Sequence, residues 1–281
     1  MLLAATTASA QYVHIELKNG EVYDYDSKDI KSLTVDNKAP NPAPLQPGEK
    51  VEGVVTVGGK TYTKTVGGTV GNAVDLGLPS GTLWADHNVG ATEAEDYGAY
   101  LAWAEVGAVE EGYTNGVKSN YAWSITKYSN GTYNSWSKCV ATSLYGTVDD
   151  RIVLDPMDDA AYVNWGGDWR MPTCDEQAEL RTMCTWTWVT TGIKDANGNY
   201  IKGYKVVGPN GNSIFLPAAG WRNDGSLDRV GSYGYYWSSS LHTNYGFNAY
   251  VLRFGTTDVY DGNSGRYLGH GVRPVCCIER N

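Results

Sequence analysis

The stretch "YYWSSSLHTNYGFNAYVLRFGTTDVYDGNSGRYLGHGVRPV", residues 235–275, is typical of β-strands joined by polar loops. Side chains alternate between the two faces of a strand. In "NAYVLRF" we expect the face with Tyr250, Leu252 and Phe254 to be core. The other face carries Val251 and Arg253. The segments "YYWSSS" and "GVRPV" are expected to be framework as well, and the loops between these strands are the parts free to contact a ligand.

The whole chain has the composition of a folded acidic protein. Its 281 residues correspond to roughly two domains, and 42% of them are hydrophobic, enough for a core. The net charge is −9 and there is no basic run. Nucleic acid is therefore excluded as a partner, because phosphate binding needs clustered Lys and Arg. Tyr and Trp far outnumber Phe, which indicates rings whose polar ends meet water or hydrogen-bond partners.

The N-terminus predicts export. Residues 1–10 of "MLLAATTASAQ" read as the remnant of a signal peptide, with an apolar stretch and a cleavage site of the Ala-x-Ala type at Ala8 and Ala10. A disordered N-terminus is the alternative. No later apolar stretch approaches the roughly 20 residues that a membrane-spanning helix needs. We expect the protein at the cell surface, in the periplasm or secreted, without a membrane-spanning segment.

After this remnant, the chain divides into four parts. Residues 11–35 form a small β unit turning at Asn19-Gly20, and residues 36–50 are a stiff, Pro-rich linker. Residues 51–72 form a β-hairpin connector turning at Gly58-Gly59, and residues 73–281 form the main domain. The N-terminal parts together look like a stalk.

Two short helices are expected among many strands of the main domain, which makes the fold class α+β. One candidate is "EAEDYGAYLAWAEV", residues 93–106, interrupted by Gly98. The clearer one follows "WRMPT", where Thr173 is a good N-cap and Glu176 completes a capping box.

Six ordered blocks resemble a known family: "DLGLPSGTLWADHNVGA", "EDYGAYLAWAE", "NWGGDWRMPT", "FLPAAGWR", "YYWSSS" and "GHGVRPV". Over about residues 74–275 the chain resembles the FISUMP-type domain of exported Bacteroidetes proteins. That family is similar to C-type-lectin-like folds and to the formylglycine-generating enzyme. The resemblance implies a C-type-lectin-like domain preceded by a small β-rich N-terminal unit.

Catalysis is not expected. By the resemblance, catalytic relatives carry a cysteine pair that binds copper or a histidine cluster that binds iron. Here the C-terminal part holds only the adjacent Cys276 and Cys277, and the four histidines are scattered without metal-ligand spacing. We therefore expect no enzyme activity, no metal and no cofactor. A metal-dependent oxidase or sulfoxide synthase, and a structural cell-envelope module, are the alternatives.

Other motifs have structural explanations. The five cysteines are irregularly spaced and are expected to be reduced and mostly buried. "DANGN", residues 195–199, is better explained as a hairpin turn than as a calcium loop. "DPMDDAA" is expected to be a helix N-terminus or a solvated loop. Arg170 and Arg273 are expected to hold structural corners.

The window 242–270 has an unusual composition. It contains no Lys, Glu, Gln, Met or Trp, although about five would be expected at their frequency in residues 1–241. These five types cannot be reached when the first two bases of an AAC or AAT asparagine codon are randomised. Residues 242–270 therefore look like the variable region of a target of a diversity-generating retroelement. A loop-rich β surface that lacks long charged side chains by chance is the alternative.

Tyr, Ser, Gly, Asn and Arg dominate this window, as they do in antibody-like binding loops. We expect a binding surface for a protein or a glycan, presented by a monomer. The residues expected to point outward are Tyr245, Arg253, Asp258, Tyr260, Asp261, Asn263 and Leu268. The residues expected to add polar contacts are His242, Asn244 and His270.

Overall fold

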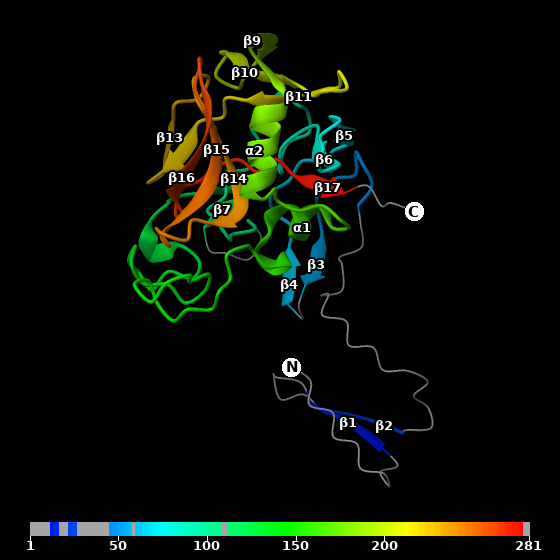
Figure 1. Cartoon of the computed structure of the whole chain (residues 1–281), viewed down its shortest axis with the longest axis vertical. Coiled ribbons are helices and arrows are strands. Elements are labelled where there is room, and N and C mark those ends of the chain that lie inside the picture. The colour runs from blue at the N-terminus through cyan, green and yellow to red at the C-terminus, as the bar shows by residue number, and fades with distance from the viewer. Residues whose placement is uncertain (1–11, 17–21, 27–44, 58–59, 108–111, 278–281) are drawn as a thin grey trace. The chain divides into compact units, whose positions relative to one another are not determined.

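The computed structural model describes residues 12–16, 22–26, 45–57, 60–107 and 112–277, which fall into two units divided after Ala39 (Figure 1). In the first unit, β1 (Tyr12–Glu16) and β2 (Val22–Asp26) form an antiparallel pair. The return strand starts at Val22, as the sequence predicts. Several predicted features lie outside the described residues: the signal remnant, the turns at Asn19-Gly20 and Gly58-Gly59, and most of the Pro-rich linker.

The second unit is mixed and rich in strands, so the α+β class is confirmed. Its α-helices in the described residues are α1 (Ala160–Trp165) and α2 (Cys174–Met183). Its strands up to residue 118 are β3 (Val54–Val57), β4 (Lys60–Thr63), β5 (Ala73–Asp75), β6 (Thr82–Ala85), β7 (Tyr113–Thr114) and β8 (Val117–Lys118). Its later strands are β9 (Thr185–Lys194), β10 (Tyr200–Val207), β11 (Ser213–Pro217), β12 (Trp221–Asn223), β13 (Ser226–Asp228), β14 (Gly234–Leu241), β15 (Asn248–Phe254), β16 (Val259–Gly265) and β17 (Val275–Cys277).

The helix predicted at residues 93–106 is wrong. Tyr100 forms a bridge with Val117 and Leu101 forms one with His270, and turns precede and follow these bridged residues, so the segment is irregular rather than helical. Residues 99–107 are all buried, and long-range packing here overrides the helix propensity of Ala and Leu. The helix is instead α1, which Asp159 caps by accepting hydrogen bonds from the backbone of Ala161 and Tyr162. This confirms "DPMDDAA" as a helix N-terminus.

Helix α2 begins as its sequence predicts. The Thr173 side chain accepts from the backbone N–H of Glu176, and the Glu176 side chain accepts from the backbone N–H of Thr173. Glu176 also forms an ion pair with Arg170, at 2.5 Å. Arg170 therefore holds a structural corner. No helix in the described residues is long and apolar enough to cross a membrane.

The connector is part of the second unit rather than separate from it. Val51, Val66 and Val70 are buried in the same core cluster as Trp103, and Val55 packs in the cluster of Val106 and α1. The boundary expected at residue 72 is therefore not a boundary in the structure, because these valines bury their side chains in the main domain.

Strands β14, β15 and β16 form an antiparallel sheet in that order. Both of its faces are covered near the centre. Leu252 and Phe254 belong to a core cluster shared with Leu180 of α2 and with β10 and β11, as the alternation predicts. Tyr250, expected to be core with them, is only half-buried, because its ring lies against His242 rather than in that cluster. Val251, on the opposite face, is also buried, beside Trp237 in the other main cluster, so the second face of β15 is core too.

The C-terminal strand β17 closes the domain by pairing with β6, where Val275 lies opposite Trp84. Arg273, fully buried, donates to Asn88 Oδ1 at 2.8 Å and to the carbonyl oxygens of Ala85 and Phe215. It holds a structural corner, as expected. All five cysteines are free, but only Cys139 is buried and Cys277 is exposed, so the expectation of mostly buried thiols is wrong.

Candidate recognition surface

Two buried ion-pair groups hold the long loop of residues 119–150, drawn in green beside the sheet β14–β16 (Figure 1). Lys118 Nζ lies 2.5 Å from Glu105 Oε2, and both side chains are almost inaccessible to water. The Asp158 carboxylate, with no exposed area, pairs with Lys127 at 3.0 Å and Lys138 at 2.6 Å. Burial raises the pKa of Asp158, but the two ammonium groups and the Tyr128 hydroxyl outweigh it and hold the pKa below its usual value.

Arg266 joins this loop to the loop of residues 242–247. Its guanidinium is buried, lies over the rings of Trp136 at 3.7 Å and Trp103 at 4.7 Å, and donates to carbonyl oxygens of both loops. The acceptors are Cys139 and Gly246, each at 3.2 Å. Burial lowers the pKa of Arg266 to about 10, so it remains charged at neutral pH. Arg266 lies inside the predicted variable window, yet it is framework.

Rings of the two loops, of β15 and of the segment after β16 form a connected group that we call the aromatic face. Its members are Trp123, Tyr133, Tyr145, His242, Tyr245, Phe247, Tyr250 and Tyr267, and none of them is buried. The ring of Phe247 lies within 6 Å of those of Tyr133, Tyr145 and Tyr245. The His242 ring lies between those of Tyr245 and Tyr250, with ring centres 5.1 Å and 4.8 Å away. Tyr133 and Tyr245 are each 53% exposed, so the surface is open to a partner.

A second group of rings lies on the Val251 face of the sheet, around Arg253. Its guanidinium carbon lies 5.7 Å from the ring centre of Tyr233, 4.9 Å from that of Tyr235 and 5.1 Å from that of Tyr260. Arg229 lies over Tyr233 at 5.0 Å. We call Arg229, Tyr233, Tyr235, Arg253 and Tyr260 the arginine–tyrosine cluster.

Local backbone geometry brings Arg229 to this cluster. Its φ of 57° lies in the left-handed region, which is uncommon for residues other than glycine. The Arg229 carbonyl oxygen accepts hydrogen bonds from the backbone N–H groups of Ser232 and Tyr233. This tight turn places the guanidinium and the Tyr233 ring side by side.

The predicted contact residues do not form one surface. Tyr260 and Asp261 are neighbours on β16 and point to opposite faces of the sheet, as strand geometry requires. Tyr245 and His242 lie on the aromatic face, whereas Arg253 and Tyr260 belong to the arginine–tyrosine cluster. Asn244 and Asp258 are exposed in the loops, and Leu268 is half-buried.

Two predicted residues already have protein partners. Asp261 forms an ion pair with Arg181 of α2 at 2.7 Å, and Asn263 Oδ1 accepts from the Asn248 side chain at 2.7 Å. Both remain exposed, but a ligand would have to compete with these contacts.

The expectation that His270 adds a contact at the surface is wrong. Its side chain has no exposed area, and its ring packs against Tyr235 at 5.1 Å and Trp237 at 4.4 Å. Its Nε2 lies 2.8 Å from Ser264 Oγ. Burial lowers the pKa of His270 to about 3, so the ring is neutral and belongs to the core.

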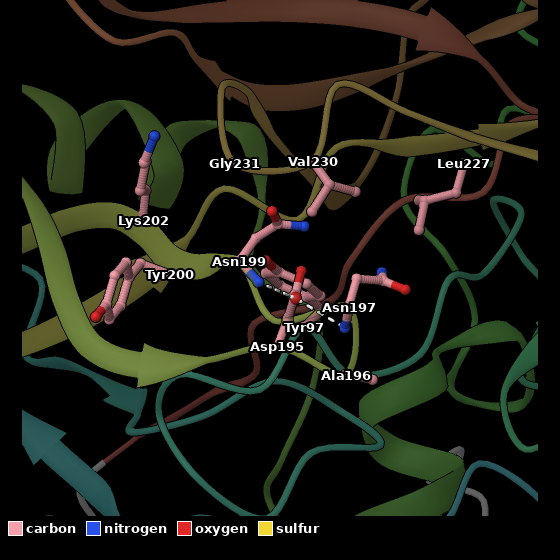
Figure 2. Close-up of a pocket in the computed structure, with 10 residues that line it drawn as sticks. All are labelled: Tyr97, Asp195, Ala196, Asn197, Asn199, Tyr200, Lys202, Leu227, Val230 and Gly231. Carbon is pink, nitrogen blue, oxygen red and sulfur yellow. Dashed lines mark hydrogen bonds between the residues drawn. The ribbon is translucent and has the colours of Figure 1, made fainter.

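A pocket of about 620 Å³ lies outside the predicted window, between the β9–β10 turn and residues 227–231 (Figure 2). Asp195 Oδ1 accepts hydrogen bonds from the backbone of Asn197 and Asn199, which confirms "DANGN" as a hairpin turn. Burial and then the Asp195 charge raise the pKa of Tyr97 in this pocket to about 12. Within the described ranges no three His, Cys, Asp or Glu side chains gather as metal ligands.

Sequence reasoning missed three of the eight rings of the aromatic face and two of the five members of the arginine–tyrosine cluster. Tyr133, Tyr145 and Trp123 come from residues 119–147, which have the same Tyr, Ser, Asn and Gly-rich composition as the predicted window. That composition was the available signal. Arg229 and Tyr233 had none, because their turn has no periodicity and only the fold brings it to β15.

Comparisons with known protein families, with curated proteins and with solved structures found no match.

Proposed function

We propose that this chain is an exported ligand-binding protein, comparable to a receptor or adhesin, with a recognition surface on a C-type-lectin-like scaffold. Its ligand is a protein or a glycan. The resemblance of the six sequence blocks supports the scaffold, and the N-terminal segment supports export.

The aromatic face is the observation that carries the proposal. Its eight rings form one connected group of pairwise contacts, and none of them is buried. Tyr250 lies on β15, and the other seven lie outside the strands and α-helices. Contiguous exposed apolar patches on soluble proteins mark interaction sites. Tyr and Trp supply large contact areas with few rotatable bonds, and they dominate the binding energy of interfaces.

The buried ion pairs and Arg266 support the same proposal. A loop that carries binding residues loses less entropy on association when it is already ordered. Lys118, Asp158 and Arg266 fix the two loops to the domain core, so the rings are preorganised.

Binding should be tested with an array of glycans and extracellular proteins probed with the purified full chain. We expect the Tyr245→Ala variant to lose binding to any arrayed ligand that the wild type binds. The matched control is Tyr200→Ala, since Tyr200 is 51% exposed and lies outside the aromatic face. Equal binding by the Tyr245→Ala variant and the wild type would contradict the proposal.

Diversification by a retroelement is a separate part of the proposal, and the DNA tests it. A near-copy of the coding stretch for residues 235–275, differing only at adenines and lying beside a reverse transcriptase gene, is the expected finding. We expect the differences at codons of exposed residues such as Asn244, Tyr245 and Asp258, and none at the buried Arg266 and His270. Differences concentrated at buried codons would contradict it.

A further inference from the structure

The arginine–tyrosine cluster stands out when the arginines of the described residues are compared. Arg151, Arg170 and Arg181 form ion pairs with carboxylates. Arg266 and Arg273 donate to carbonyl oxygens. Arginines 222, 229 and 253 have neither kind of partner in the described part of the chain, and each instead lies over an aromatic ring.

Arg229 and Arg253 share a ring, that of Tyr233, at 5.0 and 5.7 Å. Aromatic rings interact with the faces of a guanidinium and leave its N–H edge free to donate. Nε of Arg253 is buried without an acceptor, as is Nε of Arg266, but Arg266 donates through its terminal nitrogens and Arg253 has no such hydrogen bond among the described residues. Each of the two guanidiniums thus lies over the Tyr233 ring with no carboxylate of the described residues within 4 Å, in a chain whose net charge is −9.

We infer that the arginine–tyrosine cluster is a second contact surface, which binds carboxylate side chains of an acidic polypeptide segment. The inference rests on the proposed recognition role. It concerns the face of the β14–β16 sheet opposite to the one that carries Tyr250. Carboxylates match the planar N–H edge of Arg in a two-pronged geometry, and the Tyr233 and Tyr260 rings offer apolar contact beside it. A sulfated glycan also presents anions, and the test below distinguishes it from an acidic polypeptide.

The test uses fluorescence anisotropy of a labelled decapeptide of alternating glutamate and glycine, with the full chain. We expect the glutamate peptide to bind, and its binding to weaken with added salt. The same peptide with glutamine in place of glutamate should bind at least about tenfold more weakly. Arg253→Gln and Arg229→Gln should each weaken binding of the glutamate peptide by about tenfold. Arg229 is exposed, so its variant tests the inference even where Arg253→Gln unfolds the protein.

The controls separate this surface from the aromatic face. Arg151→Gln removes an arginine that is 48% exposed and already paired, and it should leave peptide binding unchanged. Tyr245→Ala should also leave peptide binding unchanged. Suppose that the Tyr245→Ala variant binds the peptide normally and also binds every arrayed ligand as the wild type does. The aromatic-face proposal then fails, and this inference stands.

Three outcomes would overturn the inference. One is equal binding of the glutamate and glutamine peptides. Another is undiminished binding by the Arg229→Gln variant. The third is binding of a heparin-derived octasaccharide, lost in Arg229→Gln, without binding of the glutamate peptide, because the partner would then be a sulfated glycan.

Discussion

Arg253 and Arg266 lie close together in the C-terminal segment, and their surroundings are opposite. Arg266 is buried, and carbonyl oxygens of its own chain accept its hydrogen bonds. Arg253 is half-buried against three tyrosine rings, and the described residues offer it no acceptor. The terminal nitrogens of Arg266 bind two loops together, although its Nε has no acceptor, whereas no side-chain nitrogen of Arg253 has a hydrogen-bond partner among the described residues. Residue type alone therefore does not distinguish framework from contact surface.

The largest effect is expected for Arg266→Ala. It leaves the carbonyl oxygens of Cys139 and Gly246 without a donor and opens a cavity between Trp103 and Trp136, so it should lower the free energy of unfolding by about 3 kcal/mol or more. Urea denaturation measures this. Arg253→Ala is the matched control; if it costs as much as Arg266→Ala, the contrast between the two arginines does not exist.

Asp158→Asn should be the next most damaging, by about 3 kcal/mol at neutral pH, because it leaves Lys127 and Lys138 facing an uncharged group. The pKa of Asp158 in the folded protein lies below its usual value. Its contribution is therefore complete above the unfolded pKa of about 4 and is lost as pH falls through the folded pKa. The stability difference between wild type and variant should shrink as pH falls from 6 to about 2. A difference independent of pH would show that the charge of Asp158 is not what stabilises the loop.

Arg253→Ala should lower stability by only about 1 kcal/mol, since cation–π contacts at partly exposed sites have this magnitude. Thermal denaturation measures the stability. Arg253→Lys keeps the charge but loses the planar stack, so its stability should lie between that of Arg253→Ala and that of the wild type. Full stability of the Ala variant would indicate that the tyrosines do not hold the guanidinium.

The smallest stability effect is expected for Tyr245→Ala, below about 0.5 kcal/mol, because the side chain is half exposed. Its effect belongs to binding, as tested above. A large drop in melting temperature for this variant, absent in Tyr200→Ala, would place Tyr245 in the framework instead.

Local signals in the sequence predicted part of this fold. Thr173 and Glu176 predicted the start of α2, and alternation predicted the buried face of Leu252 and Phe254. Alternation also implied that Tyr260 and Asp261 point apart, so the single surface expected for them was already inconsistent with a strand. The prediction for 93–106 failed because its Ala and Leu favour a helix in isolation, while Tyr100 and Leu101 pair with residues distant in the chain and residues 99–106 are buried.

By itself, the sequence determined the α+β class, the capped helix, the framework strands and an acidic chain with loops rich in Tyr, Ser, Asn and Gly. Those features depend on neighbouring residues or on composition. Only the tertiary structure decided that His270 is core, that Arg266 joins two loops and that Arg229 meets Arg253 over Tyr233. Burial and satisfied hydrogen bonds depend on segments far apart in the chain, and no local pattern records which of them will meet.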